Sequence, residues 1–204
     1  MEIIRGKQTS FIDPSLLAER RDGYTAVHLD LGTGDGRFVL HTAQMNPHSL
    51  VIGVDACREN LREASRRTPA NALFVIANAR ALPIELETFA DSMTINFPWG
   101  SLLQGLLDND AALMATLRAV LRANARLEVR LNGGALQEAG WQLEDGTERV
   151  RDTLMRNGFT LHQVLPLRAH DLRACPTTWA KRLAFGRDPR AMYLAAKRDR
   201  SGTK

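Results

Sequence analysis

The chain has 204 residues, which is enough for one hydrophobic core of ordinary size and short for two domains. Hydrophobic residues make up 44% and charged residues 25%, and no apolar run is long enough to span a bilayer, so composition excludes a disordered or membrane-spanning chain. The net charge of +4, carried almost wholly by arginine, indicates an anionic partner, although genome base composition explains such a bias equally well.

The first 25 residues predict a β-hairpin followed by a short helix. EIIRG returns through KQTSFI, and Asp13 and Pro14 are typical of a helix cap and a first helical position. The segment lacks the apolar stretch and cleavage site of a secretory signal. We therefore expect a cytoplasmic protein.

From residue 26 onward, strands alternate with helices. We expect strands at 26–31, 49–55, 72–78, 91–97 and 125–132, and helices after the glycine turn and at 56–68 and 110–122. This alternation predicts an α/β fold with a parallel sheet covered on both faces. A helix ending before Gly158, a strand at 159–167 and an antiparallel strand at 191–198, at or near an edge, complete the sheet. The long connections, 133–148 and 168–187, are candidates for substrate contact.

A glycine-rich turn follows the first strand of the alternation. In DLGTGDG, Gly32, Gly34 and Gly36 occupy alternate positions after Asp30, so the backbone can turn sharply and approach a ligand beside a helix N-terminus. Dinucleotide-binding turns have the spacing G-x-G-x-x-G. The spacing here resembles the first motif of Rossmann-like methyltransferases that depend on S-adenosylmethionine (SAM). A tight glycine turn of another α/β protein is the alternative.

Other strand ends complete the predicted cofactor site. Asp55 ends the second strand, where a carboxylate can accept both ribose hydroxyls. Ala79 and Arg80 follow the third strand, where topology places backbone groups near the adenine ring. In this fold the end of the fourth strand presents the target to the methyl group. Here it consists of Asn96, Phe97 and Pro98.

Two tryptophans are candidates for holding a base. Trp99 follows Pro98 in NFPWG, and Trp179 lies among cations in TTWAKRLAFGR. A base extruded from folded RNA loses its neighbours, and aromatic stacking returns about 1 to 3 kcal/mol per base, so two indole faces suit it. Hydrophobic packing is the alternative for each, and it is our expectation for Trp141. The cations predicted to hold the adjoining phosphates are Lys181, Arg182 and Arg187.

Cysteine usage predicts neither a metal site nor a disulfide. Cys57 and Cys175 have no partner at metal-ligand spacing, and a reduced cytosol disfavours a bond between them.

The helix predicted at 56–68 carries a stripe of arginines. The stripe consists of Arg58, Arg62 and Arg66, four residues apart, with Arg67 beside them. Glu59 and Glu63 favour a solvated face with local ion pairs. The position of the helix directly after the cofactor strand favours contact with RNA, and we adopt that interpretation.

Three motifs in this order, DLGTGDGR, FPWGSLL and WAKRLAFGR, resemble the kanamycin-apramycin resistance methyltransferases, which modify N1 of a decoding-site adenine (1408) in 16S rRNA. The likeness runs from the N-terminal hairpin to Arg187. It implies a class I SAM-dependent methyltransferase fold with a mainly parallel seven-stranded sheet, helices on both faces and an N-terminal β-hairpin. We expect one domain, 1–204, with 1–25 as the hairpin extension and 133–148 and 168–187 as substrate-facing linkers.

The resemblance also implies residue roles. Trp99 and Trp179 clamp the flipped adenine. The cofactor-binding positions are Gly32, Asp55 and Ala79, with Thr177 and Thr178 lining the cofactor side. Arg182 and Arg187 match RNA-contacting positions, and Lys7 of the hairpin is expected to join them. The chain departs from the family at Arg80, where an acid is usual, at Asn96, where an apolar residue is usual, and after Arg67, where the basic segment is shortened.

The resemblance predicts SAM-dependent methylation of 16S rRNA within the 30S subunit, by a protein expected to be a monomer. Adenine N1 has an in-plane lone pair and no proton at neutral pH, so the transfer requires alignment and no general base. Three alternatives remain at this point. They are a tRNA guanine-N7 methyltransferase, a nucleotide-dependent oxidoreductase with a longer glycine spacing, and a catalytically silent RNA-binding protein of the same fold.

Overall fold

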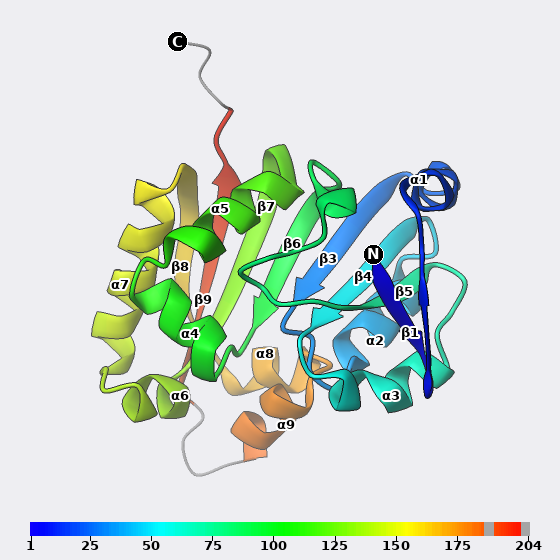
Figure 1. The fold of residues 1–204 in the computed structure, drawn as a ribbon. Coiled ribbons are helices and arrows are strands. Elements are labelled where there is room, and N and C mark those ends of the chain that lie inside the picture. Colours follow the sequence, from blue (N-terminus) through cyan, green and yellow to red (C-terminus); the bar gives the residue numbers. More distant parts are fainter. Residues whose placement is uncertain (186–189, 201–204) are drawn as a thin grey trace.

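Nine strands form one sheet in the part of the chain that this computed structural model describes, residues 1–185 and 190–200 (Figure 1). Their order is β2-β1-β5-β4-β3-β6-β7-β9-β8. The strands are β1 (Glu2–Arg5), β2 (Gln8–Phe11), β3 (Ala26–Leu31), β4 (Ser49–Asp55), β5 (Ala72–Ile76), β6 (Ala90–Asn96), β7 (Leu121–Asn132), β8 (Phe159–Leu167) and β9 (Ala191–Arg198).

The five central strands, β5-β4-β3-β6-β7, run parallel, and the outer pairs are antiparallel. The predicted seven-stranded sheet corresponds to β3 through β9. The predicted hairpin, β1 and β2, joins the same sheet through an antiparallel pair between Ile3 and Val75, so the sheet has nine described strands instead of seven. The last strand, β9, lies between β7 and the edge strand β8, which agrees with its predicted place near an edge.

Helices connect the strands. They are α1 (Pro14–Asp22), α2 (Arg37–Met45), α3 (Arg58–Arg66), η1 (Ile84–Leu86, a 3₁₀ helix), α4 (Gly100–Leu107), α5 (Ala111–Val120), α6 (Gly133–Glu138), α7 (Leu143–Arg156), α8 (Ala169–Ala174) and α9 (Thr178–Phe185). The predicted cap of α1 is present, because the Asp13 side chain accepts a hydrogen bond from the Leu16 amide at 2.9 Å. No described helix has the length and apolar character required to cross a membrane.

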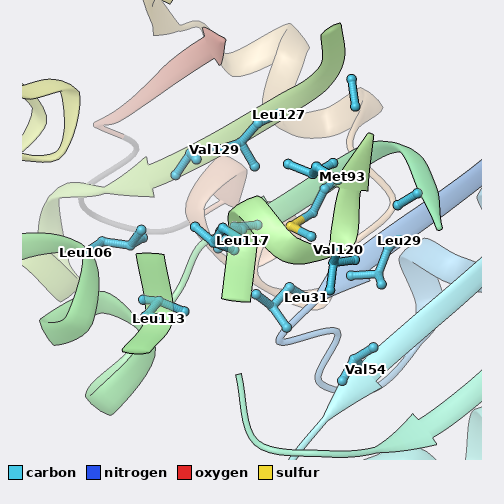
Figure 2. Packing of buried hydrophobic residues seen from close by; sticks show 14 of the residues in the cluster. Leu29, Leu31, Val54, Met93, Leu106, Leu113, Leu117, Val120, Leu127 and Val129 are labelled. Atoms are coloured by element: carbon cyan, nitrogen blue, oxygen red, sulfur yellow. The ribbon is translucent and has the colours of Figure 1, made fainter. Parts of the chain in front are cut away.

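The helices form layers on the two faces of the sheet. Helices α4, α5 and α7 cover one face, and α2 and α3 cover the other (Figure 1). Leu29 and Met93 of neighbouring strands pack with Leu117 of α5 in the main core (Figure 2). Burial on both faces explains why β4 reads as the continuous apolar run from Leu50 to Val54.

Helices α4, α6, α8 and α9 were not expected from the sequence. Helix α4 begins at the last residue of NFPWG, Gly100, and buries Leu103 and Leu106. Gly105 lets it approach α5 closely, because a Cβ there would lie 2.8 Å from Leu113. The connection 133–148 contains α6 and the first six residues of α7. The connection 168–187 contains α8 and α9, which lie beyond the carboxyl ends of the parallel strands (Figure 1). Trp179 is therefore on a helix and not in a loop.

Candidate cofactor and base-binding site

A cavity of about 710 Å³ lies at the carboxyl ends of the parallel strands. Its wall is formed by the glycine turn after β3, the ends of β4, β5 and β6, and the first turn of α9. Every residue predicted to bind the cofactor lines it, together with both candidate tryptophans. These residues are Asp30, Gly32, Gly34, Asp55, Ala79, Arg80, Asn96, Phe97, Pro98, Trp99, Thr177, Thr178 and Trp179.

The three glycines of the turn have left-handed backbone angles, with φ of +71°, +57° and +71° at Gly32, Gly34 and Gly36. A Cβ at Gly36 would lie 2.6 Å from Ala64 and 2.7 Å from Phe74, so this glycine is required by packing as well as by φ. A Cβ at Gly34 would meet no atom within 4 Å. The turn is therefore packed on its helix side and open at Gly34.

Asp55 stabilises the turn from the neighbouring strand. One of its carboxylate oxygens accepts a hydrogen bond from the Gly34 amide at 2.8 Å, and the other accepts one from the Cys57 amide at 2.8 Å. A carboxylate oxygen has capacity for a second bond, so Asp55 can still accept ligand hydroxyl groups.

Asp30 is almost completely buried beside the turn. Its Oδ1 accepts hydrogen bonds from Thr94 Oγ1 at 2.6 Å and from Asn96 Nδ2 at 2.8 Å. Burial raises the pKa of Asp30 to about 6, against the opposing effects of these hydrogen bonds and of the nearby Arg130 guanidinium. At neutral pH this carboxylate is an anion in a site that favours a cation.

These residues fit SAM. The carboxylate of Asp30 suits a ligand with positive charge, Asp55 suits ribose hydroxyls, and the open surface at Gly34 leaves space for close approach. Among the described residues, no group of three or more His, Cys, Asp or Glu side chains is placed to hold a metal ion.

The guanidinium of Arg80 forms an ion pair with Asp110 at 3.1 Å. The backbone carbonyl oxygen of Arg80 accepts a hydrogen bond from the Thr116 hydroxyl at 3.2 Å. Asp110 is also the N-cap of α5 and accepts from the Leu113 amide at 2.8 Å. Arg80 is thus held to α5, while its backbone remains on the cavity wall.

Trp99 and Trp179 stack on each other, with ring centroids 5.1 Å apart and planes inclined by 17°. Each is 38% exposed, which is high for a side chain whose role is core packing. The Trp99 Nε1 donates to Glu138 of α6 at 3.2 Å, and the Arg182 guanidinium lies 5.1 Å from the Trp179 ring centroid. By contrast, Trp141 packs against the main core, as expected.

Helix α9 is joined to the glycine turn. The Thr178 hydroxyl donates to the carboxylate of Asp35 within DLGTGDG, and Thr177 Oγ1 accepts from the Ala180 amide at 2.9 Å at the start of α9. This hydrogen bond therefore fixes the helix that carries Trp179 to the glycine turn on the cavity wall.

The predicted basic residues form two groups. On α3, Arg62 pairs with Glu59 at 3.3 Å and Arg66 with Glu63 at 2.9 Å, and the hairpin turn before Lys7 packs against Arg66. The remaining members of this group are Arg58, which donates to Thr9 at 3.4 Å, and Arg67, which follows α3. Lys181 and Arg182 are exposed on α9, and Arg187 lies outside the described residues.

Sequence reasoning missed several residues of the site. Asn60 donates to Asp55 at 3.4 Å, and Leu102 of α4 lies against Gly32. Glu138 holds the Trp99 indole, and Arg130 Nη1 donates to Asn96 Oδ1 at 2.8 Å. Arg130 lies on the face of β7 opposite to the core residues Val129 and Leu131, and an arginine near the end of a central strand was a signal, because an arginine with little exposure needs partners.

The chain matches the family model described as NpmA: 16S rRNA (adenine(1408)-N(1))-methyltransferase over residues 2–198. A 16S rRNA (adenine(1408)-N(1))-methyltransferase of Escherichia coli is 31% identical, with 92% of this chain and 94% of the relative covered. One of the same description from Streptoalloteichus hindustanus is 30% identical over the same shares.

Solved structures of methyltransferases are similar to this chain over nearly its whole length. The 16S rRNA methyltransferase KamB is 26% identical with a TM-score of 0.89, covering 98% of this chain and 100% of that one. The aminoglycoside resistance methyltransferase NpmB1 is 31% identical with a TM-score of 0.81, covering 97% and 100%. The predicted Rossmann-like fold of SAM-dependent methyltransferases is thereby confirmed.

Proposed function

Because the chain belongs to the family of 16S rRNA (adenine(1408)-N(1))-methyltransferases, we propose that its cavity binds SAM and that Trp99 and Trp179 hold adenine 1408 of 16S rRNA for methylation at N1. The chain is a SAM-dependent methyltransferase. The observation that carries the proposed residue roles is the pair of half-exposed indoles on the wall of the cavity that suits SAM.

The cofactor roles follow from the charges and donors of the cavity. Asp30 favours the cationic methionine half of SAM, the glycine turn lies against it, and Asp55 accepts the ribose hydroxyls. Ala79 and Arg80 offer backbone groups to the adenine ring. When bound, SAM supplies an electrophilic methyl group, and transfer to N1 moves its positive charge onto the target base.

The two tryptophans replace the stacking contacts that the adenine loses when it is extruded from the RNA. Stacking on an indole returns about 1 to 3 kcal/mol per base, which offsets the unstacking that extrusion requires. The adenine ring becomes cationic as N1 is alkylated, and indole faces attract a desolvated cation by roughly 2 kcal/mol. The clamp therefore binds the methylated form of the ring more strongly than the neutral one, which favours the transition state.

The reaction requires no proton acceptor, because adenine N1 attacks through a lone pair that lies in the ring plane. What the protein must do is align N1 with the methyl group, and such positioning contributes up to about 7 to 11 kcal/mol when two reactants are held in a reactive geometry. The tie between Thr178 and Asp35 supports this role, since it fixes the helix that carries Trp179 to the turn that faces the cofactor.

The substrate assembly is the 30S subunit in this proposal, and the enzyme acts in the cytoplasm as a monomer. The basic groups on α3 and α9 hold phosphates of the surrounding rRNA. A methyl group at N1 of adenine 1408 gives resistance to aminoglycosides of the kanamycin and apramycin class. The similar protein NpmB1 is an aminoglycoside resistance methyltransferase, which supports this part of the proposal.

The test is methyl transfer from labelled SAM to purified 30S subunits, with the modified nucleotide located by reverse-transcriptase arrest. A methyl group at N1 blocks base pairing, so we expect an arrest at adenine 1408. Free 16S rRNA and tRNA serve as competing substrates in parallel reactions. Transfer to tRNA without transfer to 30S subunits would refute the proposal in favour of a tRNA guanine-N7 activity.

A further inference from the structure

A chain of polar side chains crosses three neighbouring strands beneath the cofactor cavity. Asp30 of β3 accepts from Asn96 Nδ2 of β6 at 2.8 Å, and Asn96 Oδ1 accepts from Arg130 Nη1 of β7 at 2.8 Å. The other terminal nitrogen of Arg130 forms an ion pair with Glu128 at 2.9 Å. Each hydrogen bond has good length, and the side chains of Arg130 and Glu128 are only 18% and 17% exposed.

Asn96 has one donor group and one acceptor group in use, and their directions are fixed by its two neighbours. The amide can donate to Asp30 only if its oxygen faces Arg130, so the guanidinium selects the amide orientation that places a donor on the carboxylate. An apolar residue at this position would leave both Asp30 and Arg130 without that partner. A charge with little exposure is destabilised when it loses a hydrogen-bond partner.

We propose that Arg130, acting through the Asn96 amide, is a positioning residue that aims the Asp30 carboxylate into the cavity and holds it as an anion for SAM. This inference rests on the proposed function, because it assigns Asp30 to the cationic part of SAM. Arg130 makes no contact with the cavity, whereas Asn96 and Asp30 line it.

Several other groups surround Asp30. Thr94 joins it to His28, whose Nε2 lies 3.1 Å from Thr94 Oγ1. Burial lowers the pKa of His28 to about 4, so this ring is neutral near pH 7, and burial raises the pKa of the Cys175 thiol, which stays protonated. Among charged groups, Arg130 of β7 acts on Asp30 and is itself paired with Glu128, while Asp55 of β4 and Asp35 of the glycine turn share the cavity wall with Asp30.

The experiment measures SAM affinity by calorimetry between pH 5 and 9 for the wild type and for Arg130→Met. In the wild type, affinity falls as the pH drops through the Asp30 pKa of about 6, because the protonated carboxyl no longer attracts a cation. Loss of a nearby opposite charge raises a carboxyl pKa, so the midpoint in Arg130→Met moves to higher pH. At high pH, where Asp30 is ionised in both proteins, Arg130→Met still binds SAM more weakly, because the carboxylate is no longer aimed through Asn96.

Arg126→Met is the matched control. Arg126 is on the same strand and also pairs with Glu128, at 2.8 Å, but no hydrogen bond joins it to Asn96. Its removal leaves the midpoint unchanged. A second variant, Asn96→Leu, removes the link itself and shifts the midpoint in the same direction as Arg130→Met, which keeps the test valid if Arg130→Met folds poorly.

The two hypotheses fail differently. If the wild type does not bind SAM, the proposed function is wrong. If the wild type binds SAM with a midpoint near pH 6, and the folded Arg130→Met and Asn96→Leu proteins show the same midpoint, the positioning role is wrong and the proposed function stands. A merely structural role lowers the melting temperature of the variants without moving this midpoint.

Discussion

The indole rings of Trp99 and Trp179 occupy the space that a base would need between them. Their centroids are 5.1 Å apart, which is an ordinary distance for one stacked aromatic pair. A base between two indoles requires two contacts of about 3.5 Å each, or roughly 7 Å between the ring planes. One indole must therefore move when a base enters, and until then the two stacked faces cover each other.

This self-stacked pair should have a spectroscopic signature. Two indoles in contact couple their transitions, so we expect an exciton couplet in the far-ultraviolet circular dichroism of the free protein. Trp99→Ala and Trp179→Ala should each abolish it to the same extent, because either change removes the pair. Trp141→Phe is the control, since Trp141 packs against the main core. A couplet that survives in either alanine variant would show that the rings do not stack in solution.

Turnover should depend on each tryptophan separately. Loss of one stacking platform removes about 1 to 3 kcal/mol, so kcat/KM for 30S subunits should fall roughly 5- to 150-fold in Trp99→Ala and in Trp179→Ala. SAM affinity should change little, because the predicted cofactor contacts come from other residues. Trp141→Phe again serves as the control. Turnover near the wild-type value in either alanine variant would rule out a two-sided clamp.

Two alanine variants of the glycine turn separate its two roles, because Gly36 is packed against neighbours and Gly34 faces the open cavity. In Gly36→Ala the new Cβ would lie 2.6 Å from Ala64 in addition to its φ of +71°, so we expect a loss of about 2 to 5 kcal/mol in the free energy of unfolding. Gly34→Ala has open space and only the strain of its φ, about 1 to 2 kcal/mol. Urea unfolding measures both losses. Gly34→Ala should weaken SAM binding beyond its small effect on stability, because its Cβ enters the cavity.

Local sequence patterns sufficed for the sheet and for the cofactor wall. Apolar runs ending in Asp30 and Asp55 mark strands whose carboxyl ends meet at one edge, so the residues that follow them share one cavity. The glycine spacing specified the turn because only glycine readily adopts its backbone angles. These features depend on neighbours in the chain, and they could be read without knowing tertiary contacts.

Contacts between residues far apart in the chain could not be inferred from local sequence patterns. Asn96 and Arg130 are 34 residues apart, and Trp99 and Glu138 are 39 apart, so no local pattern indicates either pair. Helices α8 and α9 are short, and their formation depends on packing of Leu172 and Ala180 against Phe97. The amino-acid sequence identified Asn96 as unusual, but its partner became visible only when β6 and β7 were paired.

The arginines of α3 provide a test of RNA docking. Their partners Glu59 and Glu63 are exposed, and such ion pairs contribute at most about 1 kcal/mol, so they leave the arginines free to bind phosphates. Charge reversal at both Arg62 and Arg66 should weaken 30S binding and reduce the slope of log K against log salt by about 2. SAM affinity should not change. Arg151→Glu is the control, because Arg151 pairs with Glu148 at the same spacing on α7. Unchanged 30S binding in the double variant would assign the stripe to a solvated face.

Asp30→Asn should make the protein more stable near neutral pH while weakening SAM binding. The pKa of Asp30 is about 6 in the folded protein and 3.8 as the reference for the unfolded chain, so the folded state binds the proton more tightly. Stability therefore falls as the pH rises from about 4 to 6, and an ionised Asp30 costs about 3 kcal/mol at pH 7. Urea unfolding should show Asp30→Asn gaining up to this amount at pH 7 and almost nothing at pH 4.

His28, with a pKa lowered to about 4, has a pH dependence of opposite sign that is present in both proteins and cancels in their difference. A gain independent of pH would mean that the wild-type carboxyl does not titrate in this range. A gain at pH 7 alone would mean that the fold accepts an unfavourable buried anion at the place where the cationic cofactor is proposed to bind.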